Sequence, residues 1–465
     1  MTIIKFKGAL PLFMNGANFQ EKRRAAEEVV SRLAKNGFSA LFAGGYVRDK
    51  LLGNAESADI DIATDAKPQA VMKLFSHTIA VGVRFGVVIV VHNGIPFEVT
   101  TFRSDIGIGD GRHPDRVTYT DAHDDALRRD FTINGMFYDP LGDRIIDFVA
   151  GEKDLRAKIV RAIGDPMRRF KEDYLRLLRA IRFAARLGFS IDEGTWKAII
   201  ANAVGIGEVS AERIFAEFDH MLRQPHPDRA LMLLLDSGLL HETIPEVADL
   251  VEVEQPAEFH PEGDVFSHTV KALGILAQGD ISEPVSAVLG WSVLLHDVGK
   301  KVTMQRLDRI RFNNHHKVGA ALARAILKRM RAPNDLLDAV SACIENHMNF
   351  MNVTEMRLST IKKLFLRPTI NDELELHRID CLASHGNLDN YYFVKNRFAA
   401  LALERIKPSP LLRGADLLAL GFEAGPVFGT ILREVYDLQL DEKLHSRIDA
   451  IKYVKERWGE GGGEE

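Results

Sequence analysis

Apolar and polar residues alternate in short runs near the start of the chain, whereas a helical repeat dominates the rest. Between residues 39 and 102, runs rich in Val, Ile, Phe and Thr predict strands at "SALFAGG", "DIDIAT", "FGVVIVVH" and "PFEVTTF". Helical stretches such as "KPQAVMKLF" lie between them, and the "HNG" after the third run predicts a hairpin. From about residue 151 strand signals nearly vanish. The pattern therefore predicts an α+β chain, with a small α/β head followed by a long all-helical body.

Segments rich in Pro, Gly or Glu interrupt the helical pattern. They are "RQPHPD" at 223–228, "EVEQPAEFHPEGD" at 252–264 and "KPSPLLRG" at 407–414. We therefore expect four parts, which are the head at 30–150, a helical neck at 151–225, a helical body at 226–400 and a helical tail at 401–465. Each of these domain boundaries is defined to within several residues.

Composition narrows the class of protein. A chain of 465 residues with 46% hydrophobic content is long enough for several folded cores. Its net charge of −5 argues against a uniformly basic nucleic-acid coat but leaves room for a local cationic groove. The longest apolar run, 85–91, is far too short for a bilayer span, and the start of the chain lacks a signal-peptide pattern. Two cysteines make no disulfide framework, so we expect a cytoplasmic protein without a membrane segment.

The stretch "DIDIAT" places two carboxylates on one predicted strand. Asp59 and Asp61 are two residues apart, so both point to the same face and repel each other unless a cation lies between them. Oxygen ligands in this arrangement suit Mg²⁺, and Glu98 in "PFEVTTF" is the candidate third carboxylate of a two-metal site. The alternative is that the two aspartates only line the wet face of an amphipathic strand.

A glycine pair precedes these carboxylates, in "LFAGGYVRDKLLG". Gly44 and Gly45 would let backbone N–H groups approach a phosphate, and "YVRDKLLG" reads as a helix whose N-terminus favours negative charge. Arg48, early in that helix, can contact a triphosphate. An ordinary strand-to-helix turn is the alternative explanation, and the combination with the carboxylates favours phosphate handling.

The second cluster is "ALRRDFTINGMFYDP" at 126–140. Arg128, Arg129 and Asp130 precede "FTING", in which Asn134 can hydrogen-bond a ribose or a phosphate. The alternative is that the two adjacent arginines only form a solvated surface patch.

The third cluster, "EDYLRLLRAIRFAARLGF" at 172–189, predicts one amphipathic helix. Arg176, Arg179 and Arg182 recur every three residues, which is typical of a solvated face over an apolar core. The more specific hypothesis pairs Asp173 with Arg176. Such a pair can read the amine-plus-acceptor edge that cytosine and adenine share, and it rejects guanine and uracil, while Arg179 and Arg182 face the triphosphate.

These three clusters, in this order, resemble the class II tRNA nucleotidyltransferase and bacterial poly(A) polymerase family over about residues 39 to 225. The resemblance implies a polymerase-β-like nucleotidyltransferase head, then helical neck, body and tail domains that hold the tRNA acceptor arm, with Mg²⁺, ATP and CTP as cofactor and substrates. It assigns metal binding to Asp59 and Asp61. It assigns nucleotide binding to Gly45, Arg48, Arg129, Asp173, Arg176, Arg179 and Arg182. Gly135 departs from the alanine that the family usually has after "TIN", and we expect it to loosen that turn.

A second group of candidate ligands lies in the helical body. Histidines and carboxylates dispersed over helices can converge on one or two divalent metals in a bundle core. The motifs "FSHTV", "LLHDVGK", "FNNHHKVGA", "IENHM" and "HRIDCLASHG" resemble the HD phosphohydrolase superfamily. The resemblance assigns four basic ligands to His268, His296, Asp297 and Asp380, with His315 and His347 where variants with extra histidines place theirs. It implies a divalent transition metal and water attack on a phosphate ester.

The leading hypothesis is template-independent addition of CMP and AMP, as CCA, to tRNA 3′ ends. The primer hydroxyl would attack the nucleotide α-phosphate at a magnesium site formed by Asp59 and Asp61. One alternative is a poly(A) polymerase or an A-adding enzyme. Another is an HD metal phosphohydrolase whose head only binds RNA. In the tail, 411–440 predicts two helices around the turn "GFEAGPVFG", which is either a tRNA contact or a core hairpin. The oligomeric state stays open.

Overall fold

The computed structural model describes residues 18–57, 59–80, 82–106, 116–256, 258, 263–278, 284–306, 308–401 and 406–459. Contacts divide the chain into two compact units, Met1–Pro245 and Glu246–Glu465, which are treated separately below. The stretch "GIGDGRHPD" at 107–115 lies outside the described residues.

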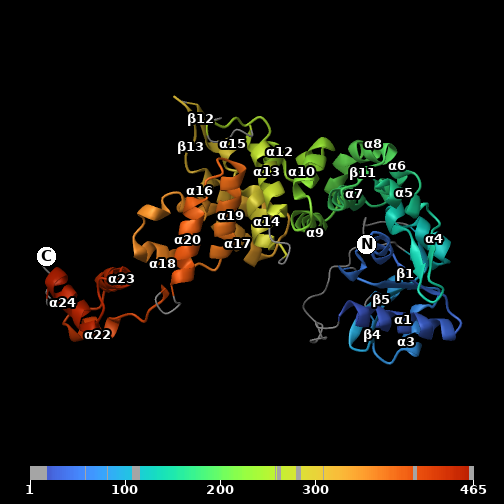
Figure 1. The fold of residues 1–465 in the computed structure, drawn as a ribbon, viewed down its shortest axis with the longest axis horizontal. Coiled ribbons are helices and arrows are strands. Elements are labelled where there is room, and N and C mark those ends of the chain that lie inside the picture. The colour runs from blue at the N-terminus through green and yellow to red at the C-terminus, as the bar shows by residue number, and fades with distance from the viewer. Residues whose placement is uncertain are drawn as a thin grey trace. The chain divides into compact units, whose positions relative to one another are not determined.

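A seven-stranded mixed sheet forms the head of the first unit (Figure 1). Its order is β3-β4-β5-β2-β1-β8-β9, and among the described residues only β2 and β5 pair in parallel within this sheet. The strands are β1 (Ala40–Ala43), β2 (Asp61–Thr64), β3 (Thr78–Ile79), β4 (Val87–His92), β5 (Ile95–Thr101), β8 (Phe137–Asp139) and β9 (Arg144–Ile146). A separate antiparallel pair is formed by β6 (Arg103–Ile106) and β7 (Arg116–Tyr119).

The predicted hairpin is confirmed. Strands β4 and β5 pair in antiparallel register from Val87–Thr100 to His92–Ile95. Asn93 and Gly94 form the turn with φ values of 50° and 75°, as a two-residue turn between twisted strands requires. Helices α1 (Phe19–Lys35) and α3 (Pro68–Leu74) contact each other, and both contact β4.

Helices follow the head sheet. The remaining helices of the first unit are α2 (Gly45–Leu51), α4 (Ala122–Leu127), α5 (Gly151–Ala157), α6 (Pro166–Glu172), α7 (Leu175–Leu187), α8 (Glu193–Ala201), α9 (Ala211–Leu222), α10 (Pro227–Asp236), α11 (Leu239–Thr243) and α12 (Pro245–Ala248), the last of which crosses into the second unit. Two short strands, β10 (Ile159–Val160) and β11 (Ser190–Ile191), pair in parallel. Among the described residues, strands after residue 151 occur only as two-stranded pairs.

The predicted single helix over 172–189 is wrong in one respect. Helix α6 ends at Glu172 and α7 begins at Leu175, because Asp173 leaves the helical region, with φ −158° and ψ 101°. Its carboxylate accepts a hydrogen bond from the Leu175 backbone N–H at 3.1 Å. A short polar side chain competes in this way with the helical ladder and ends it.

Helices make up most of the second unit. They are α13 (Val265–Ala277), α14 (Ala287–Leu295), α15 (Lys300–Thr303), α16 (His315–Arg329), α17 (Asn334–Asn346), α18 (Leu358–Phe365), α19 (Ile370–Ala383), α20 (Asp389–Ala400), α22 (Gly414–Ala419), α23 (Pro426–Leu440) and α24 (Arg447–Trp458). A hairpin of β12 (Met304–Arg306) and β13 (Ile310–Phe312) precedes α16. Helices α13, α14, α17 and α19 pack together as a bundle, with α16 on α17. The tail has its own core, which includes Leu417, Ile431 and Val454.

The observed architecture is therefore the predicted one, a sheet-containing head followed by helices. The finer division into four parts stays a prediction. None of the described helices combines the length and the apolar character that crossing a bilayer requires. Cys343 and Cys381 are both free and buried.

Candidate functional site

Three carboxylates lie at one end of the central strands of the head. Asp61 is the first residue of β2, and the parallel register that pairs Ile62 with Val99 brings Asp61 beside Glu98 on β5. Asp59 precedes the strand instead of lying on it, because β1 pairs with β2 only as far as Ala43 and Asp61. Its carboxylate contacts Lys22 Nζ of α1 at 2.9 Å.

Burial and neighbouring carboxylates raise the proton affinity of Asp61. The pKa of Asp61 is raised to about 7. The largest cause is the loss of hydration among the surrounding protein groups, and repulsion from Glu98 and, to a smaller extent, from Asp59 adds to it. By surface area the residue itself is exposed. Burial also raises the pKa of Glu98. Crowded carboxylates that resist ionisation are relieved by a cation, and an all-oxygen donor set suits Mg²⁺. The three residues therefore fit a magnesium site.

Gly44 forms the turn between β1 and α2. Its φ of 67° and ψ of −123° lie in a region that is essentially restricted to glycine. A Cβ on Gly44 would also lie 3.0 Å from Arg129 Nη1, whereas a Cβ on Gly45 would meet nothing closer than 3.7 Å. Arg129 is in turn close enough to Asp61 to lower its pKa. Arg129 thus lies next to the Gly44 turn and near the carboxylate of Asp61.

A buried polar network runs from α2 to the "RRDFTING" turn. Arg48 binds both carboxylate oxygens of Asp49, at 2.8 and 2.9 Å, and donates to Asn134 Oδ1 at 2.7 Å. The Asn134 amide donates to Asp130 Oδ1 at 3.1 Å. Asp130 Oδ2 accepts from Arg179 Nε at 2.8 Å and Nη2 at 2.5 Å. Arg48, Asn134 and Asp130 therefore link α2 and the "RRDFTING" turn to Arg179 of α7.

The expectation of a solvated arginine face on α7 is wrong for two of its members. Arg179 and Arg182 are buried, at 8% and 7% exposure. Arg182 Nε donates to Glu217 Oε2 of α9 at 2.6 Å, and Arg179 lies 3.8 Å from the same carboxylate. Burial tends to raise the pKa of Asp130, but the charge of Arg179 outweighs it and holds that pKa well below its usual range. Whether either arginine also reaches a triphosphate stays a prediction.

Asp173 and Arg176 are not paired with each other through their side chains in the structure. Arg213 Nη2 of α9 lies 2.9 and 3.2 Å from the two oxygens of Asp173. Arg176 Nη1 donates to the Arg169 carbonyl at 2.7 Å and to Glu172 Oε2 at 3.2 Å. Both remain partly exposed, so their polar groups stay accessible to a ligand.

Sequence reasoning missed the partners that fix these groups. Asp125 binds Arg128 at 2.8 Å and Arg129 at 3.0 Å, and burial, which tends to raise its pKa, is outweighed by those two charges. The spacing of Asp125 from both arginines on one helical turn was a usable signal. Glu217, Arg213 and Lys22 lie 35 or more residues from their partners, and no local pattern points to them. At Gly135 a Cβ would lie 2.7 Å from Val149 Cγ2, so the glycine permits close packing there, and the expected loosening of the turn stays a prediction.

In the second unit, the six predicted ligands gather into two groups of three. His268, His296 and Asp380 form the first group, and Asp297, His315 and His347 form the second. Within each group the ligand atoms lie within 4.8 Å of one another. Asp297 lies between the groups, with Oδ2 at 3.2 Å from His296 Nε2 and Oδ1 at 3.6 Å from His315 Nε2. We call this arrangement the six-ligand centre.

Backbone carbonyls orient the histidines. The Nδ1 atoms of His296, His315 and His347 lie 2.9, 2.9 and 2.6 Å from carbonyl oxygens three residues earlier in the chain. A carbonyl only accepts, so each Nδ1 carries the proton and each Nε2 presents a lone pair to the centre. The Nε2 atoms of His315 and His347 are 3.3 Å apart, as are those of His296 and His268. The facing lone pairs of His315 and His347 repel at this distance unless a cation lies between them, so the donor set fits divalent metals.

Burial and charge keep the ligands in their metal-binding forms. Burial lowers the pKa of His347 to about 3, which keeps this imidazole neutral. Burial would raise the pKa of Asp297, but nearby positive charge, including that of Lys300, holds it well below its usual range. Gly299 permits the packing, because a Cβ there would lie 2.2 Å from the His315 carbonyl oxygen. Of the six ligand side chains, only Asp380 is substantially exposed, at 25%, so the centre is open to solvent on the side of Asp380.

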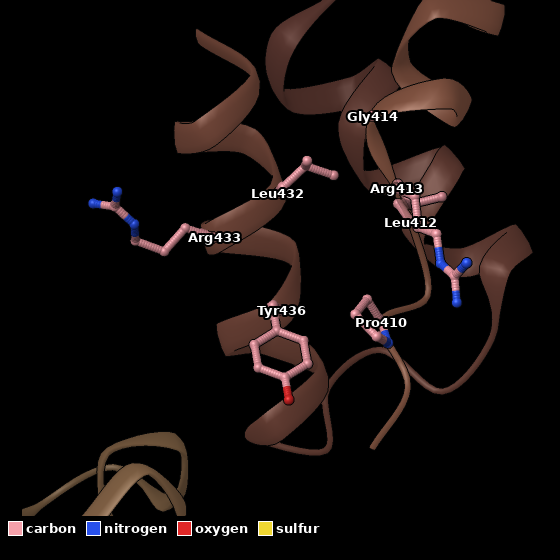
Figure 2. A pocket seen from close by; sticks show the side chains of 7 residues that line it. All are labelled: Pro410, Leu412, Arg413, Gly414, Leu432, Arg433 and Tyr436. Carbon is pink, nitrogen blue, oxygen red and sulfur yellow. The ribbon is translucent and has the colours of Figure 1, made fainter. Parts of the chain in front are cut away.

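The tail carries a shallow pocket of about 450 Å³ between the start of α22 and the middle of α23 (Figure 2). Its walls are mainly apolar, from Pro410, Leu412, Leu432 and Tyr436. Figure 2 shows the side chains of Arg413 and Arg433 extending on opposite sides of this pocket. Within the described residues neither arginine forms an ion pair. The predicted helix, turn and helix of this region are present.

Known families match three segments of the chain. Residues 40–161 match the poly A polymerase head domain, residues 188–250 the probable RNA and SrmB-binding site of polymerase A, and residues 265–384 the HD domain.

Similar proteins are named CCA-adding enzymes. Those of Geobacillus sp. (strain WCH70) and Pediococcus pentosaceus are 46% and 44% identical over 221 and 216 residues, or 47% and 46% of this chain. Each alignment covers 54% of the relative, so the chain spans about half the length of the curated relatives it matches. The solved CCA-adding enzyme of Bacillus stearothermophilus in complex with CTP matches at a TM-score of 0.74 and 27% identity, over 94% of this chain and 97% of that chain. The chain therefore carries a poly A polymerase head domain and an HD domain on the fold of a CCA-adding enzyme.

Proposed function

We propose that this chain adds CMP and AMP to the 3′ end of tRNA without a template, using CTP and ATP, and that it does so in the cytoplasm, where tRNA is used. The observation that carries the proposal is the carboxylate group of Asp59, Asp61 and Glu98 beside the Gly44 turn, with the pKa of Asp61 raised to about 7. The likeness to CCA-adding enzymes, one of them solved with CTP, supports it.

The residues divide the work of binding and chemistry. Asp59, Asp61 and Glu98 would hold Mg²⁺, which supplies positive charge at the attacking and leaving oxygens. The backbone N–H groups at the start of α2 and the Arg129 guanidinium face the triphosphate. Asp125 orients Arg129 through contacts at 3.0 and 3.2 Å, so that arginine is positioned before substrate arrives. In this proposal Asp130 and Asn134 hold the turn, and Arg48, Arg179 and Arg182 brace it.

Base selection is assigned to Asp173 and Arg176. Asp173 accepts from the exocyclic amine of cytosine or adenine, and Arg176 donates to the adjacent ring nitrogen. Arg213 and Glu172, which bind these two side chains, hold them in place. A guanine or uracil would leave these groups unpaired, and the resulting cost gives the discrimination.

The test is incorporation by the purified chain on a tRNA transcript that lacks its last three nucleotides. With CTP alone we expect two additions, and a third only when ATP is also present. Long tails with ATP alone would identify a poly(A) polymerase instead. A single AMP added only to a transcript that ends in CC would identify an A-adding enzyme.

The tail pocket is proposed as an RNA contact. Tyr436 offers a ring for stacking, and the unpaired Arg413 and Arg433 offer charge to phosphates. The double variant Arg413→Ala, Arg433→Ala is expected to raise KM for full-length tRNA. It should leave KM for a short acceptor-stem helix unchanged, because that RNA is too short to need a second contact. Equal effects on both substrates would contradict this role.

We further propose that the HD domain is a metal-dependent phosphohydrolase. The gathering of all six ligands, with Nε2 lone pairs directed inward, supports this second activity. The expected result is hydrolysis of p-nitrophenyl phosphate or of 2′,3′-cyclic AMP with Mn²⁺, Co²⁺ or Ni²⁺, and its loss in His296→Ala. Metal-loaded wild-type protein that hydrolyses neither a monoester nor a cyclic phosphate would refute it.

A further inference from the structure

A close contact between backbone and ring lies beside the residues assigned to base selection. Gly205 is part of a short 3₁₀ helix, η4 (Ala203–Glu208), and packs against the ring of Tyr174. A Cβ on Gly205 would lie 2.2 Å from Tyr174 Cε1 and 2.5 Å from both Cδ1 and Cζ. Carbon atoms are in contact at about 3.5–4.0 Å, so only glycine lets the backbone of η4 approach the ring this closely.

The ring, and not the backbone conformation, requires glycine at this position. The φ of Gly205 lies outside the left-handed region, so other residues can adopt it. Gly207, in the same short helix, also lies outside that region, yet a Cβ there would meet no atom within 4 Å. The Tyr174 ring is therefore what distinguishes the two glycines.

Tyr174 lies at the break between α6 and α7. It is the N-cap residue of α7 and directly follows Asp173, whose φ of −158° ends the preceding helix. The Asp173 carbonyl accepts from the Arg176 N–H at 3.1 Å, and the Tyr174 carbonyl accepts from the Leu177 N–H at 3.0 Å. Asp173 and Tyr174 share a peptide unit, so a displacement of the ring turns that unit and redirects the Asp173 carboxylate.

The segment that supports the ring is anchored in the core of the neck. Ala203 and Ile206 of η4 are buried, and η4 contacts α7, α8 and α11. The chain then continues into α9, where Arg213 Nη2 lies 2.9 and 3.2 Å from the two oxygens of Asp173. One segment thus contacts two consecutive residues of the break, Asp173 through an ion pair and Tyr174 through its ring.

We propose that the Tyr174 ring on Gly205 is a positioning contact for base selection, which holds the Asp173 carboxylate where it accepts from the amine of cytosine or adenine. The inference rests on the proposed base selection by Asp173 and Arg176, and it adds two positioning residues that do not touch the nucleotide. A purely structural role predicts something different, namely that loss of the contact lowers the stability of the neck and leaves the relative affinities for nucleotides unchanged.

The experiment compares CTP and UTP binding to the full chain, with Mg²⁺ present and without RNA. CTP affinity is measured by calorimetry, and UTP affinity by competition with CTP. Gly205→Ala must move the ring by more than about 1 Å. We expect CTP affinity to fall at least about tenfold, the size of one hydrogen bond to a charged group. UTP affinity should stay unchanged, because uracil has no amine to donate to Asp173.

Three further variants accompany this measurement. Gly207→Ala is the matched control, since it makes the same backbone change in the same short helix without meeting a ring, and neither affinity should change. Tyr174→Ala removes the ring and provides a second variant should Gly205→Ala fail to fold. It is expected to lower the ratio of CTP to UTP affinity several-fold. Tyr174→Phe keeps the ring and should keep that ratio.

The ratio of the two affinities separates positioning from stability, because it does not depend on how much of the protein is folded. A lower thermal midpoint in Gly205→Ala with an unchanged ratio would overturn the inference in favour of a structural role. An unchanged ratio in Tyr174→Ala, or a reduced one in Gly207→Ala, would overturn it as well.

The wild-type chain keeps the two proposals distinguishable. Equal affinities for CTP and UTP in the wild type would refute the base selection and the positioning contact together. A preference for CTP that depends on Gly205, in a chain that adds no nucleotide to tRNA, would uphold the contact and refute the addition of CMP and AMP.

Discussion

The two candidate metal sites of this chain differ in how completely the protein assembles them. The six-ligand centre brings each group of three ligands together within 4.8 Å, and backbone carbonyls fix three of its histidines. Among the described residues, Asp59, Asp61 and Glu98 do not form such a group. Asp59 is held by Lys22, and the pKa of Asp61 is raised to about 7.

Ligand chemistry explains the difference. Neutral imidazoles can be packed against one another without a cation, provided that their protons are held elsewhere. Carboxylates repel, so an all-carboxylate site is completed only when a cation arrives, and in nucleotidyl transfer part of the coordination comes from substrate phosphates. We therefore expect the six-ligand centre to retain its metal and the head to bind Mg²⁺ together with its substrate.

The largest expected effect is a clean separation of the two sites. Asp61→Asn should reduce nucleotide incorporation by at least about a hundredfold, the lower end of the cost of losing one pre-organised electrostatic contact. His296→Ala should leave incorporation unchanged. The metal content of the second unit, measured by mass spectrometry, should fall in His296→Ala and not in Asp61→Asn. A single variant that abolished both nucleotide incorporation and metal binding in the second unit would show that the two sites are not independent.

The next effect concerns the stability of the head and neck. Asp130→Asn would leave the Arg179 guanidinium buried without its main counter-ion, a change that typically costs about 3–5 kcal/mol. Hydrogen exchange of the α7 amides should report the loss. Glu193→Gln, which removes an exposed pair with Lys197 at 2.6 Å, is the matched control and should have no measurable effect. Normal protection of α7 in Asp130→Asn would show that Glu217 alone neutralises Arg179.

Magnesium binding to the head should depend on pH. Asp61 binds its proton more tightly in the folded chain than in the unfolded one, so protonation favours folding. That contribution is fully present below about pH 4 and is lost as the pH rises to about 7. Because Mg²⁺ must displace the proton, its affinity should increase about tenfold per pH unit below pH 7 and level off above it.

Thermal shifts by Mg²⁺ at pH 5.5, 6.5 and 7.5 would measure this dependence. The Asp61→Asn variant should show no such trend. A flat profile in the wild type would mean that Asp61 is already ionised in the absence of metal.

The smallest effect tests the glycine turn. Gly44→Ala forces a side chain into a backbone region that costs about 1–3 kcal/mol, and it presses on Arg129 Nη1. Gly45→Ala, with its nearest contact at 3.7 Å, is the control. We expect Gly44→Ala to raise KM for CTP and ATP and to lower the thermal midpoint, and Gly45→Ala to change stability little. Equal thermal midpoints for the two variants would contradict the strain at Gly44.

Local patterns predicted most of the fold. The hairpin of β4 and β5 and the helices around the tail turn follow from side-chain period and turn residues, which act over a few positions. The same reasoning failed at Asp173, where one side chain's hydrogen bond to the Leu175 N–H outweighed the helical repeat.

The sequence by itself determined which residue types are available and in what order, namely three carboxylates after a glycine turn in the head and six spaced ligands in the body. Only the tertiary structure decided their partners. Arg179 is bound to Asp130, Arg182 to Glu217, Asp173 to Arg213 and Lys300 to Gln255. These pairs lie 35 to 49 residues apart, and periodicity carries no information over such distances. Packing selects the partner because a buried charge must be neutralised by whatever group the fold brings within reach.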